Sequence, residues 1–154
     1  MKKSTQKYDL KKGVDFTGIV CVFYCHDGKG NLLMHKRGQS CRDEQGVWDC
    51  GGGSLEFGES FYEAVKREIR EEYGVTPRNV HVCGIEDVLR DNEGKQTHWV
   101  AIIFSAQVNP KKVILGEPDR MDEIGWFALN KLPKRLHSKL RAHLKIVQAS
   151  NYKI

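Results

Sequence analysis

Residues 51–75 read GGGSLEFGESFYEAVKREIREEYGV, and this stretch decides the fold. Ser60 is a residue type favoured at a helix N-cap, and the segment FYEAVKREIREEY that follows contains no Pro or Gly until Gly74. We therefore expect a helix of about 14 residues that ends at the glycine. Three glycines in a row stand before it, where the backbone can approach a ligand closely.

The expected helix carries Glu68, Glu71 and Glu72 at positions i, i+3 and i+4, so three carboxylates crowd one patch and repel each other. With an advance of about 100° per residue, Glu72 falls within the apolar side of the helix. The residues that mark this expected buried face are Phe61, Val65 and Ile69. Carboxylates that lean toward an apolar face cost several kcal/mol each unless something compensates their charge.

Arg67 can pair with a neighbouring glutamate, but one guanidinium cannot neutralise all three. A divalent cation can, and Mg²⁺ prefers hard oxygen ligands that leave positions open for water and phosphate. A backbone carbonyl of the glycine loop could join such a site. The alternative is an exposed acidic helix whose glutamates form ordinary salt bridges.

The rest of the chain alternates between turn residues and runs rich in β-branched and aromatic residues. Two pairs of runs are expected to form hairpins, and a fifth run forms a short final strand. The runs are 16–25 with 32–37, 81–89 with 97–108, and 125–129. The first hairpin brings Lys36 and Arg37 to its end, where they are candidates for phosphate contacts or simply for a solvated hairpin end.

The two ends of the chain are basic. Residues 1–13 are expected to form a flexible basic tail, and residues 14–154 a single domain. A C-terminal helix is expected from about 133 to 150 because Leu136, Leu140, Leu144 and Val147 have helical spacing. Its basic residues are predicted to face solvent, with phosphate contact as the alternative.

Composition points to one soluble cytoplasmic domain. The chain has 154 residues, is 40% hydrophobic, carries a formal charge of +5, and contains no apolar run long enough for a membrane span or a secretion signal. An odd number of cysteines without a CxxC pair favours reduced thiols over a disulfide framework or a zinc site. These residues are Cys21, Cys25, Cys41, Cys50 and Cys83.

The pattern of residues 53–75 resembles a complete Nudix box, the signature of the Nudix hydrolases. Its elements are Gly53, five residues, Glu59, seven residues, Arg67-Glu68-Ile69, one residue, Glu71-Glu72, one residue and Gly74-Val75. The segments LLMHKRG before the box and GEPDRMDEIGWFALNKLP after it are similar to the flanks of nucleotide-cleaving members. Cys50 is a departure, because many members have proline just before the glycines.

The resemblance implies an α/β/α sandwich with a mixed central sheet. It also implies hydrolysis of a nucleoside diphosphate linked to a further group, with Mg²⁺ or, as a substitute, Mn²⁺. Glu68, Glu71 and Glu72 would hold the metal, the Gly53 carbonyl would contribute, and Glu59 would brace the helix through Arg67. The general base is expected to be Glu68, with Glu123 as the alternative.

For the substrate, the resemblance is closest to the MutT-like nucleoside triphosphate pyrophosphatases, which release a monophosphate and pyrophosphate. RDNE at residues 90–93 disfavours ADP-ribose and dinucleoside polyphosphates, which are recognised in other members by a proline or tyrosine after the box. Residues predicted to contact the base are Trp99, Asp122, Trp126 and Phe127, with the alternative that one or more of the aromatic residues belongs to the core.

Three other functions stay open. An ADP-ribose or nucleotide-sugar pyrophosphatase would keep the chemistry and change the substrate. A nucleotide-binding sensor without turnover would be expected to lose box glutamates, and this chain keeps them. A hydrolase of the RNA 5′ end fits the positive charge and would lose affinity steeply as salt rises. The resemblance also leaves a homodimer open.

Overall fold

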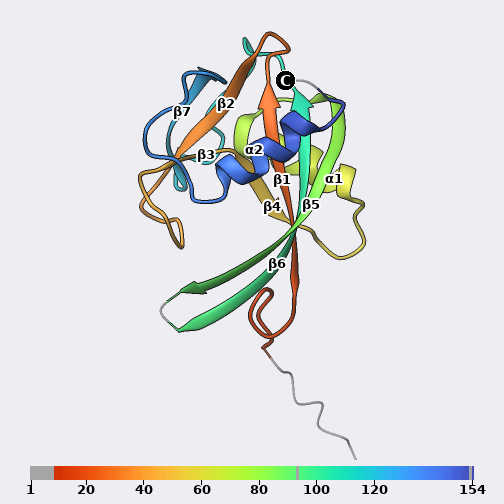
Figure 1. Ribbon diagram of the computed structural model, residues 1–154, viewed down its shortest axis with the longest axis vertical. Helices are drawn as coiled ribbons and strands as arrows, with labels where there is room; N and C mark the ends of the chain where they lie inside the picture. The colour runs from red at the N-terminus through yellow and green to blue at the C-terminus, as the bar shows by residue number, and fades with distance from the viewer. Residues whose placement is uncertain (1–8, 93, 153) are drawn as a thin grey trace, which may run out of the picture.

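The computed structural model describes residues 9–92, 94–152 and 154, and within these it contains seven strands and two helices (Figure 1). In chain order they are β1 (Gly18–His26), β2 (Asn31–Arg37), β3 (Trp48–Asp49), β4 (Gly51–Ser54), α1 (Phe61–Tyr73), β5 (Arg78–Asn92), β6 (Lys95–Gln107), β7 (Met121–Ala128) and α2 (Leu140–Ala149). Most of the predicted N-terminal tail, residues 1–8, lies outside the described residues.

The strands form one mixed sheet in the order β3-β2-β1-β6-β5, with β4 paired to β1 and β7 paired to β2. Only the central pair, β1 and β6, is parallel among the described strands, from Gly18 opposite Trp99 to His26 opposite Gln107. Both predicted hairpins are present as β1–β2 and β5–β6. The second is longer than predicted and extends away from the body of the domain (Figure 1).

Each face of the sheet packs against one helix. Alternate residues of β1 divide between the two cores, with Phe23 in the core beside α1 and Tyr24 in the core beside α2. Figure 1 shows α2 lying across the front of β1. The predicted α/β/α sandwich with a mixed central sheet is confirmed.

Helix α1 begins and ends where the sequence predicts. The Ser60 hydroxyl accepts the Glu63 N–H at 3.3 Å, Glu63 accepts the Ser60 N–H at 2.7 Å, and Gly74 has φ 62° after the last turn. The predicted burial of Phe61 is wrong, because its side chain is 41% exposed. Its neighbour Tyr62 is also exposed, although its ring contacts the sheet edge-on at Phe104, with a centroid distance of 5.7 Å.

Helix α2 is shorter than predicted, since it begins at Leu140 and not near residue 133. Residues before it pair with β3: the Trp48 N–H donates to the Arg135 carbonyl at 2.8 Å, and the His137 N–H donates to the Trp48 carbonyl at 2.9 Å. The Ser138 N–H donates to Glu44 at 2.8 Å. These backbone groups therefore form hydrogen bonds with residues far away in the chain. The helical spacing of apolar residues does not reveal such bonds. Neither described helix is long and apolar enough to cross a membrane.

Candidate active site

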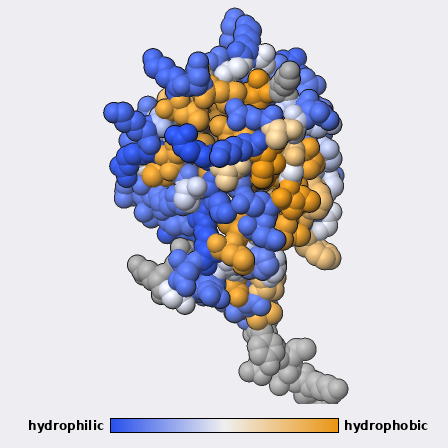
Figure 2. All heavy atoms as spheres, viewed as in Figure 1, coloured by the Kyte–Doolittle hydropathy of each residue, from blue (hydrophilic) through white to orange (hydrophobic). Residues whose placement is uncertain are grey.

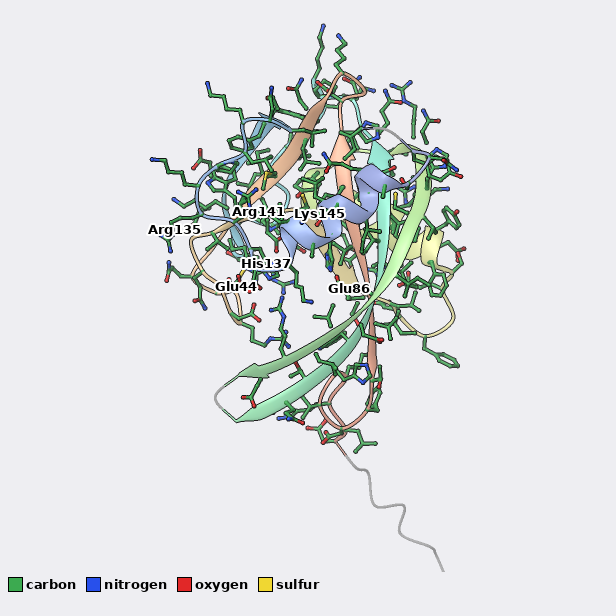
Figure 3. The ribbon with its side chains drawn as sticks, in the orientation of Figure 1. Glu44, Glu86, Arg135, His137, Arg141 and Lys145 are labelled. Carbon is green, nitrogen blue, oxygen red and sulfur yellow. The ribbon has the colours of Figure 1, made fainter. Side chains whose placement is uncertain are left out.

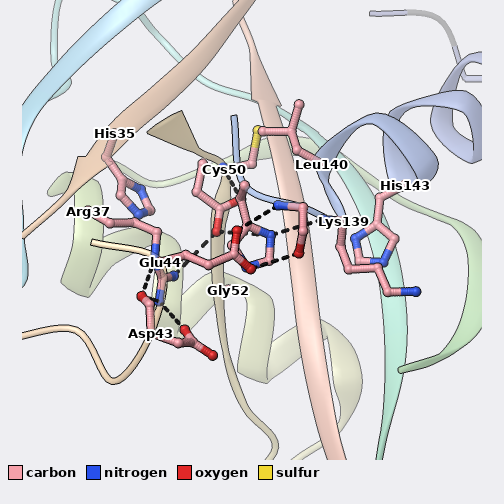
Figure 4. Close-up of polar contacts among 12 residues, drawn as sticks. His35, Arg37, Asp43, Glu44, Cys50, Gly52, Lys139, Leu140 and His143 are labelled. Carbon is pink, nitrogen blue, oxygen red and sulfur yellow. Dashed lines mark hydrogen bonds and ion pairs between the residues drawn. The ribbon is translucent and has the colours of Figure 1, made fainter. Parts of the chain in front are cut away.

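A cleft of about 590 Å³ opens beside β4. The glycine strand and the inner side of α1 form one part of its lining, with Gly51, Gly52, Gly53, Glu68 and Glu72. The end of β2, the loop 38–46, the β5–β6 hairpin and the segments 117–121 and 137–143 contribute further residues, as do β1 and β3. The cleft therefore collects residues from nearly the whole length of the chain, and Figure 4 shows the polar contacts around it.

Glu72 is the most buried carboxylate of the box, at 5% exposure. Its Oε1 accepts the Gly52 N–H at 3.3 Å, while its Oε2 has no hydrogen-bond partner among the described residues. Burial, the largest cause, raises the pKa of Glu72 well above its ordinary value, and the charge of nearby Glu68 adds to this. A buried carboxylate with an unsatisfied oxygen is unfavourable for the empty protein and well suited to a cation.

Glu68 lies against the glycine strand. A Cβ added to Gly53 would stand 1.9 Å from the Glu68 carboxyl carbon, and one added to Gly51 would stand 2.3 Å from Glu72 Oε2. The glycines are therefore required so that the carboxylates can approach the backbone of β4. Burial raises the pKa of Glu68, although the Arg67 guanidinium beside it opposes the shift.

Arg67 organises the acidic residues around it. It donates to both oxygens of Glu59, at 3.1 Å from Nε and 2.7 Å from Nη2, and also contacts Glu68 at 2.6 Å and Glu71 at 3.2 Å. Hydrogen bonding to Arg67 is the main cause that lowers the pKa of Glu59. The bidentate pair fixes the loop before α1 to the helix, which is the contact expected for a bracing role. Glu71 is the outermost of the three box glutamates, with a side chain that is 49% exposed.

The box carboxylates fit a hard divalent cation by their chemistry, and the unsatisfied Oε2 of Glu72 supports this fit. Within the described part of the chain, no three acidic, histidine or cysteine side chains are already arranged around a common metal position. Arg67 holds Glu68 and Glu71 as ion-pair partners.

An ionic network that the sequence analysis did not predict connects Arg37, Asp43, Arg90 and His137 of the lining with Glu44 and Ser138. Asp43 pairs with Arg37 at 2.8 Å and with Arg90 at 3.1 Å. Glu44 accepts from the Ser138 hydroxyl at 2.7 Å and lies 3.2 Å from His137 Nε2. The network ties the loop 38–46 to β2, to β5 and to the segment before α2, and Figure 3 shows Glu44 and His137 close together beneath α2.

Burial also shifts the pKa values of Asp49, His35 and His137, which line the cleft. The pKa of Asp49 rises to about 7 because desolvation outweighs the opposing charge of Arg37. The pKa of His35 falls to about 3 and that of His137 to about 4, with desolvation as the largest cause in both. Both imidazoles are therefore neutral near pH 7, and His35 Nδ1 lies 2.8 Å from the Tyr73 hydroxyl.

The residues predicted to bind substrate divide into two groups. Arg37 and Trp99 line the cleft, although Arg37 already pairs with Asp43 and Asp49. The others are absent from the described lining. Lys36 stands opposite Glu123 in the β2–β7 pairing, and Asp122 and Glu123 are exposed. Trp126 packs on the core beside α1 and Phe127 on the core beside α2, so the alternative that these aromatic residues are structural is the one the packing favours.

Some missed residues could have been found from strand alternation. Because Arg37 lines the cleft, His35 two positions earlier does so as well, and Lys36 between them does not. Glu117 lies in the flank GEPDRMDEIGWFALNKLP that contributes to the family resemblance, six positions before Glu123, and it lines the cleft. No local signal marks Arg90 or His137, which reach the cleft through the long hairpin and the pairing with β3.

Comparison with known proteins agrees with this geometry. The family model described as the NUDIX domain matches residues 15–147. The chain belongs to the Nudix family. It is 33% identical over 141 residues to an ADP-ribose pyrophosphatase of Methanocaldococcus jannaschii, across 86% of this chain and 76% of that protein. It is 31% identical over 117 residues to an oxidized purine nucleoside triphosphate hydrolase of Danio rerio, across 75% and 68% of the two chains.

Among solved structures, a MutT Nudix hydrolase from Burkholderia pseudomallei is 31% identical, with a TM-score of 0.75 across 85% of this chain and 98% of that chain. The protein is therefore a Nudix pyrophosphohydrolase of the MutT-like type. Its substrates are nucleoside diphosphate derivatives, and Nudix hydrolases use a divalent metal ion.

Proposed function

We propose that this Nudix hydrolase converts a nucleoside or deoxynucleoside triphosphate to the monophosphate and pyrophosphate, with Mg²⁺ as the metal. The observation that carries the proposal is the buried carboxylate of Glu72 and the partly buried carboxylate of Glu68, both against a glycine strand in a cleft of about 590 Å³. That volume is in the range of small-molecule sites, about 300–1,000 Å³. The similarity to a MutT protein and to a triphosphate hydrolase supports the choice of substrate.

Glu68, Glu71 and Glu72 would hold Mg²⁺, with the Gly53 carbonyl as an additional ligand. When bound, Mg²⁺ neutralises the anionic phosphate oxygens and polarises phosphorus toward attack. Arg67 pairs with Glu68 and Glu71, and its bidentate pair with Glu59 keeps the loop 54–59 in place. The neutral imidazole of His35 lines the cleft without adding charge to it.

A general base must remove a proton from the attacking water. Glu68 is our first candidate, because it lines the cleft and burial raises its pKa toward the range useful for a base. For the alternative in the loop before β7, we propose Glu117 in place of Glu123. Glu117 lines the cleft, whereas Glu123 is exposed and outside the described lining.

We propose that Asp49 and His137 contact the nucleotide base, with Trp99 as an aromatic surface beside it. Asp49 and His137 are 3.8 Å apart, and Trp99 lines the same cleft. These groups combine acceptors, a donor and an aromatic face, which are the elements that read a base edge. They take the place of Asp122, Trp126 and Phe127 in our assignment.

ADP-ribose hydrolysis is the second candidate, favoured by the 33% identity to an ADP-ribose pyrophosphatase. A product-resolved assay with Mg²⁺ separates the two. The panel contains the eight common nucleoside triphosphates, ADP-ribose, a nucleotide sugar and a dinucleoside polyphosphate, with Glu72→Gln as the control. A higher kcat/KM for one triphosphate than for ADP-ribose supports the proposal, and the reverse order replaces it with the second candidate.

We further propose that the protein acts in the cytoplasm. All five cysteines carry free thiols, and three of them are buried in the two cores close to the sheet. Free thiols persist in a reducing compartment. Fractionation of cells that express the protein tests this proposal. Recovery of the protein in another compartment would contradict it.

A further inference from the structure

The segment 11–16, which leads into β1, forms a turn against the sheet. The Gly13 N–H donates to the Phe16 carbonyl at 2.7 Å, and the His98 N–H of β6 donates to the Gly13 carbonyl at 2.8 Å. Figure 1 shows this turn at the lower end of β1, beside the β5–β6 hairpin. Backbone hydrogen bonds therefore give the turn 11–16 a defined place on β6.

The indole of Trp99 packs directly against two glycines at this turn. A Cβ added to Gly13 would stand 2.2 Å from Trp99 Nε1, and one added to Gly18 would stand 2.5 Å from a carbon of the same ring system. Gly13 also has φ 76°, a conformation that favours glycine. Apolar burial contributes less, since Phe16 is 46% exposed and Figure 2 shows hydrophobic surface at the lower end of the molecule. The fit of the two glycines to the indole therefore sets where the turn 11–16 lies.

The turn brings the ammonium group of Lys12 to the cleft. Lys12 lines the cleft together with Gly53 and Ser54. Its Nζ donates to the Leu55 carbonyl at 3.0 Å and to Ser54 Oγ at 3.4 Å. An ammonium has three N–H donors, so one of them is left without a partner among the described residues. This donor is available to a ligand in the cleft.

The charge of Lys12 is also unused. In the part of the chain that the structure describes, no carboxylate lies within ion-pair distance of its ammonium. The other Lys and Arg residues of the described lining each have at least one carboxylate within that distance. They are Arg37, Arg42, Arg90, Arg120 and Lys139. An anion that enters the cleft therefore meets no competing carboxylate at Lys12.

The position of Lys12 beside the glutamate box determines which part of a nucleotide it can meet. Its partner Ser54 directly follows Gly53, whose carbonyl is a proposed metal ligand, and the Glu68 carboxylate lies against the same glycine. Mg²⁺ bound by one or two carboxylates takes further ligands from the phosphates of its substrate. The ammonium therefore stands next to the expected phosphate position, and lysine is a common phosphate ligand.

We propose that Lys12 binds the phosphate chain of the nucleotide substrate, and that Gly13 and Trp99 position its ammonium for this contact. The proposal rests on the proposed function, because it assumes that the box glutamates hold the metal and the phosphates beside β4. The contact neutralises part of the phosphate charge and stabilises the bound substrate. The alternative is a bracing role, in which Lys12 only holds Ser54 and Leu55 in the loop before α1.

Binding is measured by isothermal titration calorimetry in Mg²⁺ with the α,β-methylene analogues of ATP, GTP, CTP and UTP, in which carbon replaces the oxygen of the linkage to be cleaved. The test variant is Lys12→Gln, and Lys12→Arg keeps the charge. The matched control is Lys11→Gln, which removes the same charge from an adjacent exposed residue outside the described lining. Gly13→Ala tests the positioning, because the added methyl group overlaps Trp99 while Lys12 is retained.

Lys12→Gln should bind the analogues about 10-fold more weakly than wild type, the effect of losing one charged hydrogen bond, and Lys11→Gln should bind like wild type. Lys12→Arg should recover most of the affinity. Gly13→Ala should also weaken binding, and the double variant Lys12→Gln/Gly13→Ala should lose no more than the larger single loss, since both changes remove the same contact. Unchanged binding in Lys12→Gln, equal losses in Lys12→Gln and Lys11→Gln, or losses that multiply in the double variant overturn the proposal.

Titration with Mn²⁺ in the absence of nucleotide separates phosphate contact from bracing. Lys12→Gln should keep the wild-type Mn²⁺ affinity, because an ammonium is no metal ligand, whereas a loss equal to that for the analogues shows bracing and overturns the contact. Failure of the proposed function gives a different result: the wild-type protein binds an analogue but hydrolyses no triphosphate of the panel, and the titrations still decide the role of Lys12. A wild-type protein that binds none of the four analogues overturns the contact.

Discussion

Replacing Glu72 by Gln should stabilise the metal-free protein and abolish its activity. Two opposing contributions determine how Glu72→Gln changes the free energy of unfolding. Removing the charge recovers part of a desolvation penalty of several kcal/mol for a buried carboxylate. The amide keeps an acceptor for the Gly52 N–H but places a donor where Oε2 has no partner, which costs about 1–3 kcal/mol.

The net result is an expected gain of about 1–2 kcal/mol in the free energy of unfolding without metal. For a domain of this size each kcal/mol raises Tm by about 2–4 °C, so the variant should melt about 2–8 °C higher. The gain should grow with pH. A carboxyl whose pKa is raised on folding binds more protons in the folded state, so the wild-type protein loses stability as pH rises above the ordinary glutamate range.

The assay is thermal and urea unfolding in EDTA from pH 6 to pH 8, followed by the same measurements with Mg²⁺. Mg²⁺ at about 100 times its dissociation constant should stabilise the wild-type protein by about 2.7 kcal/mol and leave Glu72→Gln nearly unchanged. Glu71→Gln is the matched control, since its half-exposed side chain should alter stability without metal by less than about 0.5 kcal/mol. A Glu72→Gln variant that is less stable than wild type in EDTA at pH 8 refutes the burial argument.

Three further predictions follow from the same geometry. Gly53→Ala should lower kcat by at least about 100-fold, because its Cβ would overlap the Glu68 carboxylate; near-normal kcat contradicts the close approach. Glu59→Gln should cost about 10-fold in metal affinity by weakening the bidentate pair with Arg67, measured by metal titration, whereas an unchanged affinity removes the bracing role. Asp49→Asn should gain stability over wild type as pH rises from about 5 to 7, by up to about 1.4 kcal/mol per pH unit, because the folded pKa of about 7 exceeds the ordinary 3.8. Urea unfolding measures this, and the same difference in unfolding free energy between variant and wild type at both pH values contradicts it.

The sequence was sufficient for the centre of the molecule because its signals there are local. The Ser60 cap, Gly74 and the spacing of the glutamates determine α1, and the contact between Glu59 and Arg67 appears where a bracing role requires it. The hairpins also follow from local patterns. Family membership then gives the mixed sheet, which no local pattern reveals, because the parallel pairing of β1 with β6 joins distant residues.

The lining of the cleft could not be derived in this way. Trp126 and Phe127 are residue types that suit contact with a nucleotide base, but on β7 their side chains pack into the two cores on opposite faces of the sheet. Asp49, Arg90 and His137 lie at the cleft because packing and backbone pairing bring together residues that are far apart in the chain. The start of α2 shows the same limit, since helical spacing from residue 133 onward loses to backbone hydrogen bonds with Trp48 and to the contact of Ser138 with Glu44.

The central claim is that the Glu68 and Glu72 cleft cleaves a nucleoside triphosphate between its α and β phosphates. Phosphorus NMR of the products, with the preferred triphosphate, Mg²⁺ and purified protein, tests it most directly. The account predicts equal amounts of nucleoside monophosphate and pyrophosphate, with no product from Glu72→Gln. Nucleoside diphosphate with inorganic phosphate, or the same products from Glu72→Gln, would contradict it.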